Sequence, residues 1–123
     1  MYIAIPCNAP GGLEAEVSNH FGECDVFTVI DIDTKNPNFD ESNVKLIENP
    51  DHLNCGMVIL RLQKAGTNVI ILNKLGHSAL QILQKEDIPL YAGTGTVQEV
   101  LKQFLKNQLQ KVTAAANLCE GKS

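Results

Sequence analysis

Apolar and polar residues alternate in the first half of the chain in a way that predicts β-strands. Residues 2–6 are mostly apolar, and we expect a short strand that Pro6 ends. Residues 25–33 place mainly apolar side chains on both of their faces, which predicts a strand that is covered on both sides. Residues 44–48 predict a further strand, and we expect it to pair with 25–33 in a meander.

The hydrophobic period changes in the second half of the chain, where helices alternate with short strands. The predicted elements are a helix over 56–65, a buried strand over 69–72, a helix over 78–86, a strand over 88–92 and a last helix of about 12 residues. Gly66 suits the left-handed C-terminal stop of the first helix. Thr96 opens the last helix, and Glu99 completes a T-x-x-E capping box with it.

The order of these elements, β-β-β-α-β-α-β-α, predicts an α/β fold. Strand–helix–strand units cross over with a right hand, so we expect 2–6, 69–72 and 88–92 to form a parallel core beside the antiparallel meander. The result is a ribonuclease H-like mixed sheet of five strands, with helices covering the sheet. We expect a single domain over residues 1–110 and a flexible C-terminal tail over 111–123, where no clear stop signal stands.

Charged residues are distributed unevenly along the chain. Their pattern, together with the short apolar runs, excludes some classes of protein. Residues 1–51 hold ten acids and two bases, whereas residues 52–123 hold four acids and eight bases. We expect no nucleic-acid partner, because such binding rests on clustered Lys and Arg that neutralise phosphates. No apolar run approaches the roughly 20 residues of a membrane-spanning helix, and no signal-peptide pattern stands at residues 1–5. We therefore expect a cytoplasmic protein without a membrane partner.

Three loops are expected to meet at the carboxyl ends of the parallel strands, where open α/β sheets bind ligands. They span residues 7–12, 73–77 and 93–96. Their glycines let backbone N–H groups approach a ligand, and the helix N-termini that follow the last two loops favour anions. The candidate binding residues in these loops are Asn8, Gly11, Gly12, Gly76, Gly93, Gly95 and Thr96. For 93–96 two interpretations stay open, a tight turn with a helix cap or an anion site.

The sequence offers little support for catalysis. Two-metal phosphoryl transfer needs several carboxylates close together, but the strands at 2–6 and 69–72 contain no acid. Asp31 and Asp33 share one strand face without an evident partner from those strands. No G-x-S-x-G elbow is present either. We expect a protein that is not an enzyme.

Histidine and cysteine residues form two close pairs that could bind metal. His20 with Cys24, and His52 with Cys55, have the spacings H-x3-C and H-x2-C. Imidazole and thiolate are ligands that zinc and iron–sulfur species prefer. The alternative is that the histidines are ordinary loop residues and the cysteines small apolar fillers. Because no C-x-x-C occurs and we expect the cytoplasm, free thiols or metal ligands are favoured over disulfides for Cys7, Cys24, Cys55 and Cys119.

Several strings together resemble the dinitrogenase iron–molybdenum cofactor biosynthesis family, the nitrogenase accessory factor-like proteins. They are "IAIP", "VSNHFGECDVFTVID", "IENP", "AGTNVIIL" and "GTGTVQEVLKQFL", and they cover roughly residues 1–110. The resemblance implies a ribonuclease H-like fold and a non-catalytic carrier of an iron–sulfur or iron–molybdenum type cofactor or its precursor. It also implies metal-cofactor donor and acceptor proteins as partners. We expect a monomer or a weak homodimer.

The resemblance points first to His20, in the block of Ser18, Phe21 and Gly22, as the cofactor ligand. Cys55 follows, because it falls where members carry a His-, Gly- and Cys-rich stretch. Cys24, which matches no position of the family pattern, and His52 complete the expected metal ligands through the two His–Cys pairs. The sequence departs from the family pattern after the strand at 69–72, where Asn73, Lys74 and His77 replace two glycines and a proline. Two other hypotheses stay open: a metal-free regulatory or protein-interaction module with an acidic surface, and a Cys-dependent enzyme.

Overall fold

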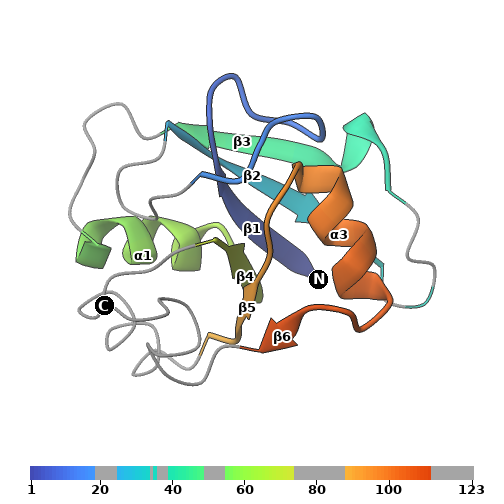
Figure 1. The fold of residues 1–123 in the computed structure, drawn as a ribbon. Helices are drawn as coiled ribbons and strands as arrows, with labels where there is room; N and C mark the ends of the chain where they lie inside the picture. The colour runs from blue at the N-terminus through green and yellow to red at the C-terminus, as the bar shows by residue number, and fades with distance from the viewer. Residues whose placement is uncertain (19–24, 34, 36–38, 49–54, 74–87, 112–123) are drawn as a thin grey trace, which may run out of the picture.

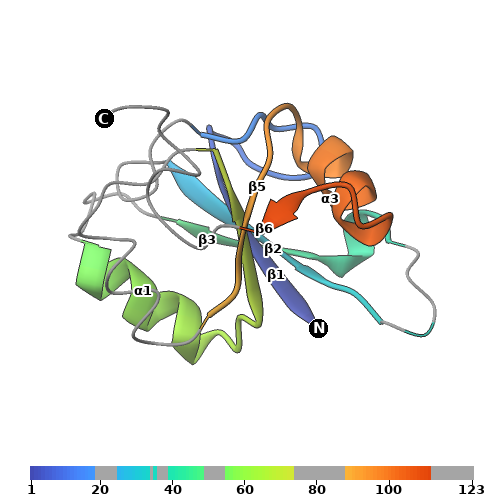
Figure 2. The same cartoon turned by 60° about the horizontal axis from the view of Figure 1, so that its bottom comes forward.

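The computed structural model describes residues 1–18, 25–33, 35, 39–48, 55–73 and 88–111. Within these residues six strands form one mixed sheet in the order β3-β2-β1-β4-β5-β6. Two α-helices, α1 (Cys55–Lys64) and α3 (Val97–Leu105), lie on opposite faces of this sheet (Figures 1 and 2). The expected α/β class is therefore confirmed. The helix expected over 78–86 lies outside the described residues.

The central strand, β1, joins an antiparallel half of the sheet to a parallel half. It pairs antiparallel with β2, which pairs antiparallel with β3, while on its other side β1 and β5 both run parallel to β4. The strands are β1 (Tyr2–Cys7), β2 (Val26–Asp31), β3 (Val44–Glu48), β4 (Val69–Leu72), β5 (Leu90–Ala92) and β6 (Gln110–Lys111), and a short 3-10 helix, η1 (Glu41–Asn43), precedes β3. The expected meander and the expected parallel core are both present.

The expectation of five strands is wrong, because β6 adds a sixth. Its two residues are polar and exposed, and they form a strand only through antiparallel pairing with Tyr91 and Ala92 of β5. So short a polar segment carries no hydrophobic period of its own. β6 also crosses the domain limit expected at residue 110, and residues 112–123 lie outside the described part of the chain.

Helix α3 is shorter than expected, but the local signal predicted for its N-terminus is present. It spans nine residues, and Asn107 follows its C-cap with φ +57°, the left-handed conformation that ends helices. Its N-terminus carries the predicted capping box of Thr96 and Glu99. Gly66, with φ +84°, likewise ends α1 as predicted.

We expected Pro6 to end β1. It does not end the strand, but it does end the pairing of β1 with β4. The backbone groups of Tyr2 face β4, since its N–H donates to Asn68 Oδ1 and its carbonyl accepts from Asn68 N–H, both at 2.8 Å. Pro6 lies four residues on and therefore lacks an N–H on the same side. The register of β1 with β4 covers only Ile3 and Ala4, whereas the register with β2 continues through Pro6 to Cys7.

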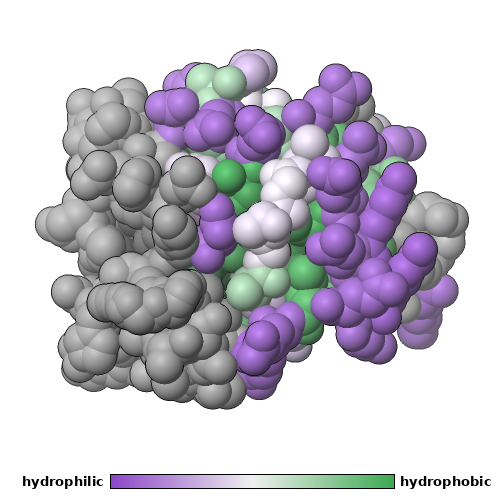
Figure 3. Space-filling model, in the orientation of Figure 1, coloured by the Kyte–Doolittle hydropathy of each residue, from purple (hydrophilic) through white to green (hydrophobic). Residues whose placement is uncertain are grey.

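Both faces of the central strands are buried, as the sequence of residues 25–33 predicted for β2. On the α3 face, the core cluster includes Ile3, Ile5, Val26, Ile30, Val69, Ile71, Val97, Val100 and Leu101. On the other face, the buried residues include Ala4, Phe27, Val29, Ile70 and Leu72, with Leu62 of α1. The outer side of α3 is hydrophilic, as the purple surface on the right of Figure 3 shows. No helix among the described residues is long and apolar enough to span a membrane.

Candidate functional site

The carboxyl ends of β1, β4 and β5 define one edge of the sheet, which we call the carboxyl edge. Two described loops lie there side by side: residues 8–15 after β1, the β1 loop, and residues 93–96 before α3, the α3 loop (Figures 1 and 2). These are two of the three loops that the sequence predicted to meet. Of the third loop, only Asn73 is described, and it is half-buried.

Residues 16–18 lie between the two loops, beyond the point where Pro6 ends the β1–β4 ladder. Ser18 N–H donates to the Pro6 carbonyl at 2.8 Å, and the chain pairs antiparallel with the end of β1. On the other side Val17 N–H donates to the Gly95 carbonyl at 2.9 Å. The chain that leads into segment 19–24 is therefore fixed at the opening between β1 and β4, which is the usual ligand position in open α/β sheets.

Side chains of β2 and of the residue before it hold the β1 loop. Ala9 N–H donates to Asp25 Oδ2 at 2.9 Å, and Gly12 N–H donates to Thr28 Oγ1 at 3.1 Å. Gly11 lies so close to the sheet that an added Cβ would be 3.0 Å from Leu46 Cδ2 on β3. The N–H groups of Asn8, Ala9, Gly11, Gly12 and Ala15 are thus donated to acceptors within the chain.

Sequence reasoning missed Asp25 and Thr28 as residues that shape this edge. Thr28 is fully buried on a face that is otherwise apolar. A polar residue at such a position needs a hydrogen-bond partner. The place of Thr28 among apolar residues in the alternating pattern could therefore have predicted its contact with a loop. Asp25 carried no comparable signal, because an exposed acid before a strand is common.

The α3 loop is held by the helix that it opens. Thr96 N–H donates to Glu99 Oε1 at 2.9 Å, and Glu99 N–H donates to Thr96 Oγ1 at 3.3 Å. The bonds from the Thr96 backbone and hydroxyl lower the pKa of Glu99. The carboxylate also lies 2.7 Å from where a Cβ of Gly95 would be, so it fills the space that this glycine leaves. The structure therefore agrees with the cap interpretation of 93–96.

The next amide groups of α3 are also paired within the chain. Val97 N–H donates to the Ala15 carbonyl and Gln98 N–H to the Leu13 carbonyl, each at 2.9 Å. An anion at this helix N-terminus would have to displace Glu99 and the β1 loop together. The N–H groups of Val97 and Gln98 therefore bond the start of α3 to the β1 loop.

Most of the predicted ligands lie outside the described residues. These are His20, Cys24, His52 and Gly76, together with His77 and Cys119. Cys55 is the first residue of α1, and Arg61 Nη1 of the same helix donates to the Glu48 carbonyl at the end of β3 at 3.0 Å. Because β3 and β4 both run parallel to β1, the helix between them begins at the carboxyl edge.

Cys7 is described fully and has a structural role. Its thiol is completely buried at the end of β1 and donates to the Ile5 carbonyl at 3.1 Å. Burial raises the pKa of this thiol to about 11, so it is protonated at neutral pH. Among the described residues, no group of three or more His, Cys, Asp or Glu side chains could hold a metal ion.

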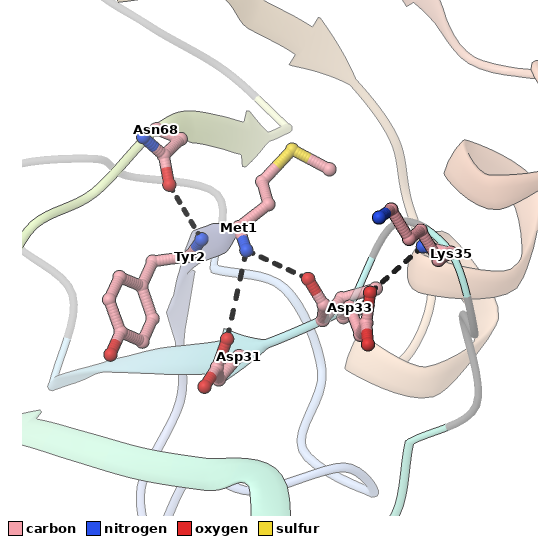
Figure 4. A network of polar contacts seen from close by, with 7 residues as sticks. Met1, Tyr2, Asp31, Asp33, Lys35 and Asn68 are labelled. Atoms are coloured by element: carbon pink, nitrogen blue, oxygen red, sulfur yellow. Dashed lines mark hydrogen bonds and ion pairs between the residues drawn. The ribbon is translucent and has the colours of Figure 1, made fainter.

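The opposite edge of the sheet holds a separate polar network (Figure 4). The Met1 amino group donates to the Ile32 carbonyl at 2.8 Å and lies 3.7 Å from Asp31 Oδ1. Asp33 Oδ1 accepts the Lys35 N–H at 2.9 Å. The two acids that the sequence left without partners therefore have partners here, at the last residue of β2 and just beyond it, away from the carboxyl edge.

Comparisons with known proteins agree with this architecture. The family model described as dinitrogenase iron-molybdenum cofactor matches residues 1–107. Uncharacterized protein MJ0580 of Methanocaldococcus jannaschii is 28% identical over 116 residues, which are 90% of this chain and 91% of that protein.

Two solved structures show the same fold over nearly the whole chain. The crystal structure of PH0822 has a TM-score of 0.75 and 26% identity, and the match covers 89% of this chain and 95% of that one. The NMR structure of TM1290 from Thermotoga has a TM-score of 0.72 and 26% identity, with 92% and 94% covered.

Proposed function

This chain belongs to the dinitrogenase iron-molybdenum cofactor family, and we propose that it is a small, non-catalytic carrier of an iron–sulfur or iron–molybdenum type cofactor or its precursor. The cofactor would be cargo, received from a donor protein and passed to an acceptor protein in the cytoplasm. The carrier would act as a monomer or a weak homodimer. The family supports the link to this class of cofactor, and the geometry of the carboxyl edge supports the place of binding.

The observation that carries the proposal is that both flanks of segment 19–24 are fixed at the carboxyl edge. Ser18 N–H is bonded to the Pro6 carbonyl on one side, and Asp25 accepts the Ala9 N–H on the other. The segment between them contains His20 and Cys24. Cys55 begins α1 at the same edge. Imidazole and thiolate from these positions are suitable ligands for iron in a cluster.

Side chains, and not the glycine-loop amides, would hold the cargo in this proposal. The amides of Ala9, Gly11, Gly12 and the first turn of α3 are donated within the chain. The loops would therefore act as a scaffold for the ligands. The N–H groups of these loops are not expected to bond cluster sulfides. This differs from the sequence-based expectation, in which the glycines let backbone N–H groups approach the ligand.

Anaerobic reconstitution with ferrous iron and sulfide tests this proposal. We expect the wild-type protein to develop visible absorbance and to retain iron and sulfide after desalting. His20→Ala and Cys55→Ser should each lower the retained iron at least about tenfold, because loss of even a group that only orients a metal ligand commonly lowers metal affinity that much. Cys7→Ala is the matched control, because it removes a buried thiol outside the proposed ligand set and should load as the wild type does.

One outcome would contradict the carrier function, and another would contradict its proposed ligands. If the wild-type protein retains no iron, a metal-free interaction module becomes the better hypothesis. If His20→Ala and Cys55→Ser retain as much iron as the wild type, the proposed ligands are wrong.

A further inference from the structure

We propose that β3 is the contact surface for a second copy of this chain, whose own β3 pairs antiparallel with it across the open border of the sheet. β3 is the last strand on its side (Figure 1), and within the described residues no strand pairs with its outer side. The other border ends in β6, whose two residues are too few for a comparable contact. The inference goes beyond the carrier function and does not depend on a cargo.

The backbone bonds of β1 show which groups of β3 point outward. Tyr2 is bonded to Asn68 on the β4 side, so the backbone groups of the next residue, Ile3, face β2. The same alternation can be followed through the registers of β1 with β2 and of β2 with β3. It turns the backbone groups of Lys45 toward β2 and those of Leu46 outward.

Val44, Leu46 and Glu48 thus present a row of N–H and carbonyl groups at the open border. The Glu48 carbonyl accepts Arg61 Nη1 of α1 at 3.0 Å, which agrees with this outward direction. Within the described part of the chain, the Leu46 backbone groups have no hydrogen-bond partner on this side. Unpaired N–H and carbonyl groups along an edge strand form a template for another strand.

The side chains of β3 favour the register in which Leu46 lies opposite Leu46 of the second copy. Val44 then lies opposite Glu48, and Lys45 lies opposite Ile47. Other registers differ by two residues or more, because a slip of one residue would exchange the faces of the sheet. Such slips bring Lys45 opposite Lys45, Leu46 opposite Glu48, or Glu48 opposite Glu48. Like charges directly opposite each other are destabilising, so the first register is preferred.

Leu46 is the side chain that this register would bury. It is 46% exposed, although its Cδ2 lies only 3.0 Å from where a Cβ of Gly11 would be. It is thus held against the β1 loop and still presents apolar surface at the border. Directly opposite residues of paired antiparallel strands have Cα atoms about 5.5 Å apart, so the two leucines would cover each other.

Pairing of this kind would leave the carboxyl edge of each copy free. β3 runs parallel to β1, because each of them pairs antiparallel with β2. Two antiparallel β3 strands would therefore turn the two carboxyl edges toward opposite ends of the dimer. A ligand at the carboxyl edge of one copy would not compete with the contact between the copies.

Sedimentation velocity of the full chain over a range of concentrations tests this proposal. The contact is small, so we expect the wild-type protein to dimerise with a dissociation constant on the order of 100 μM. Leu46→Glu and Leu46→Lys each place like charges opposite each other, and each should weaken dimerisation at least about tenfold. An equimolar mixture of the two variants should form a heterodimer about tenfold more tightly than either variant dimerises alone, because opposite charges then face each other.

Leu60→Glu is the matched control, because Leu60 is an exposed leucine of α1 with a similar exposed fraction, 42%. It should dimerise as the wild type does, and thermal denaturation should show that all variants are folded. The proposal is overturned if the wild-type protein stays monomeric to about 500 μM, or if Leu46→Glu dimerises as strongly as wild type. A mixture that dimerises no better than its components overturns the register centred on Leu46. Iron loading plays no part in this test, so its failure and that of the carrier function are separate results.

Discussion

The two loops of the carboxyl edge are both rich in glycine, yet they are stabilised in different ways. The α3 loop is closed by Thr96 and Glu99, which are three residues apart on the helix that the loop opens. The β1 loop is closed by Asp25 and Thr28, each 16 residues away from the residue whose amide it accepts. A glycine-rich loop can therefore be a local cap or a tertiary contact, and its composition alone does not distinguish these.

The difference has a consequence for the way each loop depends on the rest of the molecule. The α3 loop is closed mainly by its own helix turn. The β1 loop needs β2 and β3 in place, since Gly11 packs on Val26 and Leu46 and Gly12 donates to Thr28. We therefore expect changes in the β1 loop to affect the sheet, whereas loss of the Thr96–Glu99 contact should affect mainly α3.

Gly11→Ala is expected to have the largest effect. Gly11 has φ +82°, and an added Cβ would lie 3.0 Å from both Leu46 Cδ2 and Val26 Cγ1. Backbone strain and overpacking together should lower the free energy of unfolding by about 2–3 kcal/mol. Urea denaturation measures this change.

The neighbouring glycine supplies the control for this prediction. Gly12 has φ +95°, but a Cβ there would meet nothing within 4 Å. Gly12→Ala should therefore cost only the strain, about 1 kcal/mol. Equal losses for the two variants would show that close contact with β2 and β3 does not hold the β1 loop.

Thr96→Ala should have a smaller effect that is confined to α3. It removes the hydroxyl that accepts the Glu99 N–H, and loss of such a cap costs about 1 kcal/mol. Thr94→Ala is the matched control, because Thr94 is exposed in the same loop and lies outside the capping box. Hydrogen exchange should rise in α3 amides and not in β2, and faster exchange across β2 would contradict the local account.

The features that the sequence predicted well are those encoded by neighbouring residues. The Thr96–Glu99 box, the stop at Gly66 and the bounds of β3 each follow from a few adjacent positions. β6 was missed because two polar residues become a strand only when β5 pairs with them. The prediction that β1 ends at Pro6 was wrong. The N–H that Pro6 lacks would face β4, so only the pairing with β4 ends there, and the pairing of β1 with β2 continues.

The candidate site was predictable to the level of an edge of the sheet. Strand order places the β1 loop, the α3 loop and the start of α1 together, and this needed only the alternation of strands and helices. The contacts of Asp25 with Ala9 and of Thr28 with Gly12 depend on the register of β2 against β1, which no local pattern gives. The roles of His20, Cys24 and His52 stay predictions, since these residues lie outside the described part of the chain.

Glu99→Gln should give the smallest effect, and it is measured as a pH dependence. The pKa of Glu99 is lowered in the folded protein, so its contribution to stability is present above the unfolded value of 4.5 and is lost as the pH falls through the folded value. The glutamine side chain would keep an oxygen for the Thr96 N–H, so stability at neutral pH should change little. Acid denaturation should show a shallower loss of stability for the variant below about pH 5.

Asp40 provides the matched control for this last prediction. Its pKa is also lowered, by hydrogen bonds from the Ser42 side chain and backbone, so some acid dependence should persist in Glu99→Gln. Asp40→Asn should flatten the same pH range without changing the exchange of α3 amides, because Asp40 lies before η1 and away from the capping box. If Glu99→Gln keeps the full acid dependence of the wild type, the Glu99 carboxylate does not close the α3 loop. The proposal that this loop is closed within its own helix would then be wrong.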